Sequence, residues 1–422
     1  MSFFRLRAVS GVSKCERESK EIVFALCCLM FIPSLNNFLN SFLQIGLSLK
    51  IEILTPIAYI FMAFVSVFIL YKYIFRRRIF VFSFLALLLG TVISYCIYPE
   101  IRSVIYSSPV DLVYSPINKL FFFCVPALIG AACLTDHDRL FRSMRNWGRL
   151  SVVLGVITYI FVFFVFGKTL QYMVFSYFML LPICVCFEHA GVNGSKLDLL
   201  IAITGSVSIV LCGARGAVVS LILYFIARII LTGFGRWNKT KVLTLFASLF
   251  LVVLLLAFYE DILIMISDLL KSFGINSRFL TYLVEGALLD GTGRSTITGA
   301  VFNGLMNNPL GYGLFGDRYV VGTFGFGRYT YSHSIITELL CDFGIVAGSV
   351  IVVVLALYMI RYLVSIRGKR EVNLMLALIP YGVFQLLFSS SFLENMVFFI
   401  IIGLCFFPKT KSIKRTQNGD AT

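Results

Sequence analysis

Apolar runs of about 20 residues recur along the chain and are separated by mostly short polar connections. A helix of this length crosses the hydrocarbon core of a bilayer, and lipid leaves the backbone few other structures. The pattern therefore predicts an all-α polytopic membrane protein that forms one integral membrane domain over residues 1–422. About twelve spans are expected, at 22–43, 53–71, 79–98, 116–134, 150–167, 170–187, 198–212, 216–232, 242–259, 335–360, 374–391 and 394–407.

One long polar interruption, residues 260–334, separates the ninth predicted span from the tenth. Loops of this length in compact proteins are usually functional or disordered. This loop has turn and helix signals, and its arginines are Arg278, Arg294, Arg318 and Arg328. We expect it to be a large loop on the outer side of the membrane that carries the functional site.

Composition agrees with this topology, because 59% of the residues are hydrophobic and only 14% are charged. The net charge of +15 is unevenly distributed: 26 Lys and Arg fall on the side of the N-terminus and 10 on the other side. Cytoplasmic segments of membrane proteins carry such an excess, so both termini are predicted to be cytoplasmic and no nucleic-acid partner is expected. The first apolar run lacks a small-residue cleavage site and is interpreted as an uncleaved span.

The eleven cysteines do not predict a disulfide framework or a metal centre. Ten of them fall in or at the ends of apolar runs, and their spacings do not match those of metal ligands. They are most simply small apolar residues. Because the long loop also lacks a pair of carboxylates or a His–carboxylate cluster, neither a metal nor a cofactor is expected.

Two arginines are the leading candidates for anion binding. Arg294 follows the turn Asp290–Gly293 and begins a helix-like stretch, where free backbone N–H groups and the helix dipole favour an anion. Arg215 stands between Gly213 and Gly216 in a tight turn, and a guanidinium matches phosphate oxygens. The alternatives are an ion pair of Arg294 with Asp290 or Glu285, and an Arg215 side chain that snorkels to the interface.

His333 is the only one of the three histidines that falls outside the predicted cytoplasmic segments. A neutral imidazole accepts a proton from a hydroxyl near neutral pH, so His333 is the candidate catalytic base. Its alternative role is to cap the helix that follows. Tyr312 and Tyr331 are candidates for stacking on sugar rings, although packing of the loop also explains them. Arg278, Arg318 and Arg328 are candidates for further substrate contacts.

Three motifs in this order resemble the O-antigen polymerase and O-antigen ligase superfamily of bacterial membrane glycosyltransferases. The segments are Gly213–Ala217, Gly293–Ser295 followed by Asn308–Gly313, and Ser332–Ser334 leading into Glu338–Gly344. The superfamily often has Trp a few residues after the Gly-Arg pair and Asn after the His. Here Ser295–Thr298 and Ser334 stand in those places, so the match is imperfect.

The resemblance implies a GT-C-like fold in the bacterial inner membrane and metal-independent transfer from an undecaprenyl-pyrophosphate-linked oligosaccharide. It also implies that Arg215 and Arg294 hold the pyrophosphate and that His333 activates the acceptor hydroxyl. Membrane lipid and a chain-length-regulating membrane protein are the further expected partners. The first choice is an O-antigen polymerase. The alternatives are a ligase that transfers the glycan to lipid A–core and, as a different class, a lipid-linked oligosaccharide flippase or transporter.

Overall fold

The computed structural model describes residues 2–48, 54–76, 78–98, 116–165, 172–212, 214–233, 294–326 and 331–406, with Met265, Asp268 and Ser272. All regular structure in these ranges is helical, which confirms the predicted all-α class for this part of the chain. Six helices are long and apolar enough to cross a membrane: Glu16–Gly46, Leu54–Arg76, Arg78–Ile97, Met173–Asn193, Ile335–Ser365 and Glu371–Phe388. Three shorter apolar helices are Pro116–Ala132, Gly216–Thr232 and Met396–Phe406.

The predicted span 242–259 and most of the long loop, including Arg278 and Arg328, lie outside the described residues. Twelve spans and a large loop between the ninth and tenth therefore stay predictions. The polytopic character does not depend on that number, since six candidate spans are present in the described ranges.

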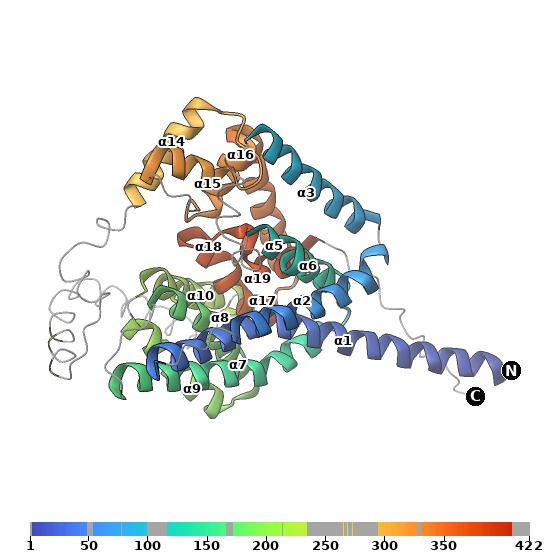
Figure 1. Cartoon of the computed structure of the whole chain (residues 1–422). Helices are drawn as coiled ribbons and strands as arrows, with labels where there is room; N and C mark the ends of the chain where they lie inside the picture. Colours follow the sequence, from blue (N-terminus) through green and yellow to red (C-terminus); the bar gives the residue numbers. More distant parts are fainter. Residues whose placement is uncertain are drawn as a thin grey trace.

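The main apolar core of the described residues lies within a bundle of helices. Figure 1 shows their arrangement. These helices are α1 (Ser2–Asn40), α6 (Val125–Ala132), α7 (His137–Ile160), α8 (Tyr172–Asn193), α9 (Lys196–Cys212), α10 (Arg215–Gly233), α17 (Glu371–Ile379) and α19 (Met396–Phe406). Sequence signals mark their ends, as at Asp136, whose carboxylate accepts the Arg139 N–H at 2.9 Å and caps α7.

Three further helices have mostly exposed apolar faces, as expected for side chains that contact lipid: α2 (Leu54–Tyr73), α3 (Arg78–Ile97) and α16 (Ile335–Ser365). Short segments connect and extend the bundle. They are η1 (Ser41–Gly46), η2 (Ile74–Arg76), α5 (Pro116–Lys119), η4 (Leu120–Cys124), η5 (Phe161–Val165), η7 (Pro380–Phe384), α18 (Gln385–Phe388) and η8 (Phe392–Glu394).

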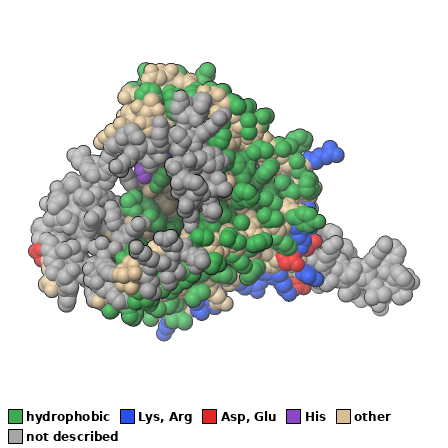
Figure 2. Space-filling model, viewed as in Figure 1, with side chains coloured by type: hydrophobic (Ala, Val, Ile, Leu, Met, Phe, Trp, Pro, Cys, Tyr) green, Lys and Arg blue, Asp and Glu red, His purple; other side chains and the backbone are tan. Residues whose placement is uncertain are grey.

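One end of the bundle is basic. Ion pairs there join the start of the apolar part of α1 to neighbouring helices, as in Arg76–Glu18 at 2.8 Å and Arg139–Glu16 at 3.3 Å. Most of the Lys and Arg side chains visible in Figure 2 lie toward the right and lower right, whereas hydrophobic side chains cover the broad middle. This clustering agrees with the uneven charge of the sequence, and the side of the membrane that this end faces stays a prediction.

The opposite end carries a small layer formed by α14 (Arg294–Asn307), α15 (Gly316–Val321) and η6 (Gly322–Phe326), which lies beside α16 at the top of Figure 1. Its own core contains Ile297, Val301, Val320 and Val321. A helix is present over Arg294–Asn307, where the sequence predicts a helix-like stretch.

Candidate functional site

The segment Asn308–Gly313 docks onto a break in α16. The helix is interrupted at Gly344, where φ is 81° and ψ is 170°. The break frees backbone groups that 308–313 then satisfies: the N–H of Tyr312 donates to the Cys341 carbonyl at 2.7 Å, and that of Gly313 donates to the Asp342 carbonyl at 2.9 Å. A Cβ on Gly344 would lie 2.5 Å from the Leu310 carbonyl carbon. Glycine therefore permits both the backbone angle and the close approach.

This docking places α15 against the first turns of α16 and buries two adjacent charged residues, Asp317 and Arg318. The Asp317 carboxylate accepts from Arg318 Nη1 at 3.0 Å through Oδ1. Its Oδ2 accepts the backbone N–H of Ser332 at 2.8 Å. Asp317 thus connects α15 directly to the loop that contains His333.

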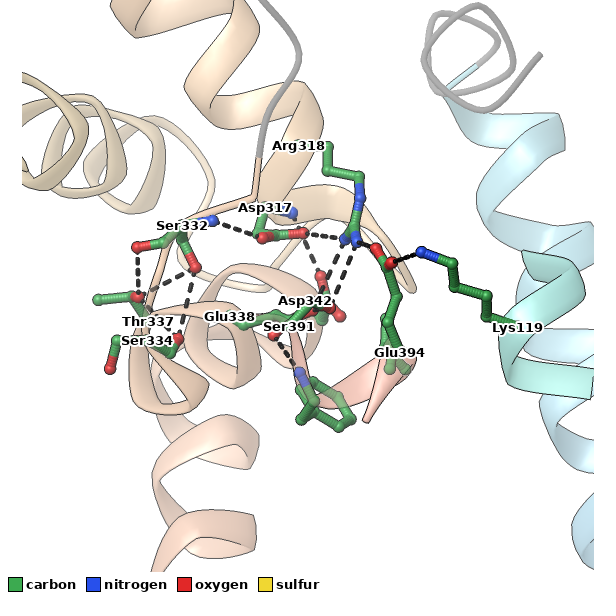
Figure 3. A network of polar contacts seen from close by, with 12 residues as sticks. Lys119, Asp317, Arg318, Ser332, Ser334, Thr337, Glu338, Asp342, Ser391 and Glu394 are labelled. Atoms are coloured by element: carbon green, nitrogen blue, oxygen red, sulfur yellow. Dashed lines mark hydrogen bonds and ion pairs between the residues drawn. The ribbon is translucent and has the colours of Figure 1, made fainter. Parts of the chain in front are cut away.

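Arg318 extends this contact into a network of four carboxylates and two cations, drawn in Figure 3. Its Nη2 donates to Glu394 Oε1 at 2.7 Å, and Lys119 Nζ donates to Glu394 Oε2 at the same distance. Glu338 accepts the Ser391 hydroxyl and, at 2.9 Å, the Phe392 N–H. Asp342 Oδ1 accepts the Asp317 N–H at 3.2 Å. The network connects α5, α15, α16 and η8 and lies next to the loop that contains His333.

Within this network, Arg318 and Glu394 stabilise each other's charged forms. Burial by itself disfavours the charged guanidinium, but the carboxylates of Asp317, Glu394 and Glu338 outweigh it and raise the pKa of Arg318. Burial likewise opposes ionisation of Glu394, but the attraction of Lys119 and Arg318 is larger and lowers the pKa of that carboxyl. These two groups therefore remain ionised where they meet.

The His333 loop is held on both sides. The Ser334 carbonyl accepts the Glu338 N–H at 2.9 Å in the first turn of α16, and the Thr337 hydroxyl donates to the same carbonyl at 2.9 Å. His333 has φ of 62°, a left-handed conformation that is uncommon for any residue other than glycine. Its ring centre lies 4.3 Å from that of Tyr331. The Tyr331 hydroxyl in turn contacts Ser389 and Ser390, and burial raises its pKa.

Arg215 is the first residue of α10, and the start of this helix lies near the end of α18. A Cβ on the adjacent Gly216 would lie 3.6 Å from the Phe388 Cβ, one residue before the Ser389–Ser391 turn. The start of α10 and the His333 loop therefore adjoin the same turn. The side chains of Arg215 and Arg294 lie outside the described residues, so their convergence stays a prediction.

Two of the candidate substrate contacts have partners within the chain. Arg318 is 3% exposed and is held by carboxylates. Tyr312 packs against Tyr98 and Tyr319, and its hydroxyl donates to the Gly304 carbonyl at 2.9 Å. Both residues therefore have a structural role, and substrate contact by either stays a prediction. Tyr331 is partly exposed beside His333 and is better placed for such a contact.

Sequence reasoning did not connect Lys119, Glu394 and Ser391 with the site. Lys119 lies 199 positions before Arg318, and Ser391 and Glu394 lie 73 and 76 positions after it, so no local pattern joins them. A usable signal existed at Glu394, an acid next to a strongly apolar run, because ionisable residues in such places are costly and usually paired. Among the described residues no group of three or more His, Cys, Asp or Glu has a metal-binding arrangement.

A comparison with protein families gives a match to part of the chain. Residues 200–352 match the model of the family described as O-antigen ligase. This segment contains Arg215, Arg294, Asp317, Arg318 and His333, and it ends before Glu394. No curated protein and no solved structure matches the chain. Through residues 200–352, the chain is related to the superfamily of O-antigen polymerases and O-antigen ligases.

Proposed function

We propose that the chain is an O-antigen polymerase, or a polymerase of a related surface polysaccharide, which joins undecaprenyl-pyrophosphate-linked repeat units at the periplasmic face of the inner membrane. The observation that carries the proposal is the family match over the segment that contains both candidate arginines and His333. That family supports a function of the O-antigen ligase or polymerase type. The proposal is also supported by the fact that the His333 loop and the start of α10 adjoin the same turn, Ser389–Ser391.

In the proposed reaction, a hydroxyl of the acceptor saccharide attacks the anomeric carbon of the donor sugar. The new C–O bond forms as the bond from that carbon to the pyrophosphate oxygen breaks, and undecaprenyl pyrophosphate leaves. The His333 imidazole takes the proton of the attacking hydroxyl. Arg215 and Arg294 stabilise the charge of the leaving group from the first turns of α10 and α14, where backbone N–H groups also face an anion.

The rival function is an O-antigen ligase, which moves the finished glycan to lipid A–core. The observation that favours it is the description of the matched family itself, O-antigen ligase. Both enzymes use the same kind of donor and differ in the acceptor, so the pyrophosphate contacts do not discriminate between them. The acceptor has to be identified from the product.

The test is the lipopolysaccharide banding pattern of a strain that lacks this chain, with and without the wild-type chain restored. Loss of a polymerase leaves core carrying one repeat unit, whereas loss of a ligase leaves core without attached glycan. Restoration by the wild-type chain shows that the change comes from this protein. An unchanged pattern in the deletion strain would rule out both functions.

A further inference from the structure

A recess lies at the far end of α16 from His333, between the end of α10 and the turn that joins α16 to α17. Its volume is about 610 Å³, within the range of roughly 300–1,000 Å³ that is typical of ligand sites. The recess is lined by Leu231, Thr232, Val364, Arg367, Gly368, Lys369, Arg370, Val372 and Asn373. Nothing in the proposed glycosyl transfer uses it.

The length of α16 places the recess at a membrane interface. After the break at Gly344, α16 continues to Ser365, a length of about 31 Å that matches the hydrocarbon thickness of a bilayer. The turn that follows therefore emerges at the level of lipid phosphates. Arg370 lies 3.8 Å from Asp138 at the start of α7, which places the recess at the basic end of the bundle.

The chemistry of the lining favours an anion. Arg367, Lys369 and Arg370 follow one another around the turn, and Gly368 with φ of 73° permits its shape. Among the described residues that line the recess none is a carboxylate. The ion pair of Arg370 with Asp138 is long, and the Arg370 side chain is 86% exposed, so the pair is weak. Asp138 therefore competes only weakly with an anionic ligand for Arg370.

The other lining residues distinguish a lipid from a free ion. Leu231, Val364 and Val372 contribute apolar surface, and Val364 is 62% exposed at the end of its span. A small anion gains nothing from these side chains, whereas the glycerol and upper acyl segments of a lipid would cover them. The two polar neighbours already bond to backbone: Thr232 to the Arg228 carbonyl at 2.7 Å and Asn373 to the Arg370 carbonyl at 3.3 Å. Positive charge is therefore the main feature that the lining offers to a ligand.

We propose that this recess binds an anionic phospholipid, with the headgroup phosphate held by Arg367, Lys369 and Arg370 and the glycerol region lying over Leu231, Val364 and Val372. Guanidinium groups provide paired N–H donors for phosphate oxygens, and lysine adds a point charge. Basic pockets between membrane helices are suited to such headgroups.

The experiment measures lipid binding to the purified full chain, delipidated in a nonionic detergent. Phosphatidylglycerol is titrated by native mass spectrometry, with phosphatidylcholine and inorganic phosphate as separate probes. The combined variant Arg367→Gln, Lys369→Gln, Arg370→Gln should bind phosphatidylglycerol on the order of 100-fold more weakly, because each cation contributes roughly fivefold in affinity. The matched control, Arg17→Gln, Lys20→Gln, Arg142→Gln, removes equal charge from exposed positions outside the recess and should bind like the wild type.

Further variants and probes test the remaining alternatives. Arg367→Lys with Arg370→Lys keeps the charge and should retain most of the binding, which separates charge loss from misfolding. Equal binding of phosphatidylglycerol by the wild type and the combined glutamine variant would overturn the proposal. So would equal binding of phosphatidylcholine, or displacement of phosphatidylglycerol by inorganic phosphate at comparable concentration, since the latter would identify a simple anion site.

Discussion

Glu394 is the residue through which two distant cations meet, because its two carboxylate oxygens accept from Lys119 and Arg318 separately. Removal of one member of a buried ionic group leaves the others without compensation, and this typically costs about 3–5 kcal/mol. A charge at this position therefore affects the whole assembly of α5, α15 and η8. The chemistry of single residues thus decides both the stability of the site and its proposed activity.

We expect Glu394→Gln to lower the free energy of unfolding by roughly 3 kcal/mol, because two cations lose their shared carboxylate. Thermal unfolding in detergent measures this. The lowered pKa of Glu394 gives a stabilisation that is present above the ordinary value of 4.5 and is lost as pH falls through the folded-state pKa. The wild type should lose this contribution in acid, and the variant should lack that part of the pH dependence. The exposed control Glu16→Gln should leave the thermal unfolding transition close to that of the wild type.

His333→Ala should reduce polymer formation by about 10²–10⁴-fold, the usual contribution of a general base. Polymer length in a complemented deletion strain gives the readout. Because φ at His333 is 62°, His333→Asn is the matched control: asparagine tolerates this conformation but cannot act as the base. Both variants should be inactive at normal protein level. Normal activity of the asparagine variant would show that backbone conformation matters there rather than proton transfer.

Arg215→Ala and Arg294→Ala should each abolish polymer while the amount of protein in the membrane stays close to normal. Their lysine variants should recover only part of the activity, because an ammonium does not reproduce the paired N–H donors of a guanidinium. Full activity in both alanine variants would contradict a pyrophosphate clamp. Direct binding of the lipid-linked donor to the purified variants separates loss of donor binding from loss of a later step.

At the scale of elements, the break in α16 decides how the layer of α14 and α15 joins the membrane bundle. The freed carbonyls of Cys341 and Asp342 become acceptors for the segment 308–313. Glycine is required at position 344 for two reasons: the backbone has a positive φ there, and the Leu310 backbone is too close to leave room for a Cβ. The motif that resembles the superfamily in this region therefore has a structural explanation that is independent of substrate.

Gly344→Ala tests this docking. The positive φ alone costs roughly 1–2 kcal/mol for a residue with a Cβ, and the contact of 2.5 Å with Leu310 adds steric strain. Gly368→Ala is the control, since its φ is 73° but no atom lies within 4 Å of the added Cβ. Thermal unfolding should show a clearly larger loss for Gly344→Ala. Equal losses would mean that segment 308–313 does not rest against the break as described.

At the scale of the whole molecule, the polar network and the basic recess lie at opposite ends of α16. The predicted orientation places the first outside and the second in the cytoplasm. Neither assignment follows from the helix packing, because the same bundle fits a membrane in either direction.

Cysteine labelling with a membrane-impermeant reagent determines the orientation. In a background without the eleven native cysteines, Thr323→Cys, an exposed position near the His333 side, should label from outside in intact cells. Lys369→Cys, on the recess side, should label only after the membrane is opened. The reverse pattern would overturn the orientation and, with it, a periplasmic site for the proposed transfer.

The sequence by itself determined the helical membrane class, because the length of apolar runs and the need to satisfy backbone groups in lipid leave little choice. It also predicted a helix after the turn signal Asp290–Gly293, and a helix is present over Arg294–Asn307. Both features depend only on residues that are close together in the sequence. The family match falls over the motifs that the sequence had already indicated.

Only the tertiary structure decided that Arg318 is held by internal carboxylates and that Lys119 and Glu394, 275 positions apart, form an ion pair. It also decided that segment 308–313 fills the break in α16. A buried charge is stable only with partners of opposite sign at close range, and a freed carbonyl only with a donor. Those partners come from remote parts of the chain, and helix packing rather than local sequence determines which of them meet.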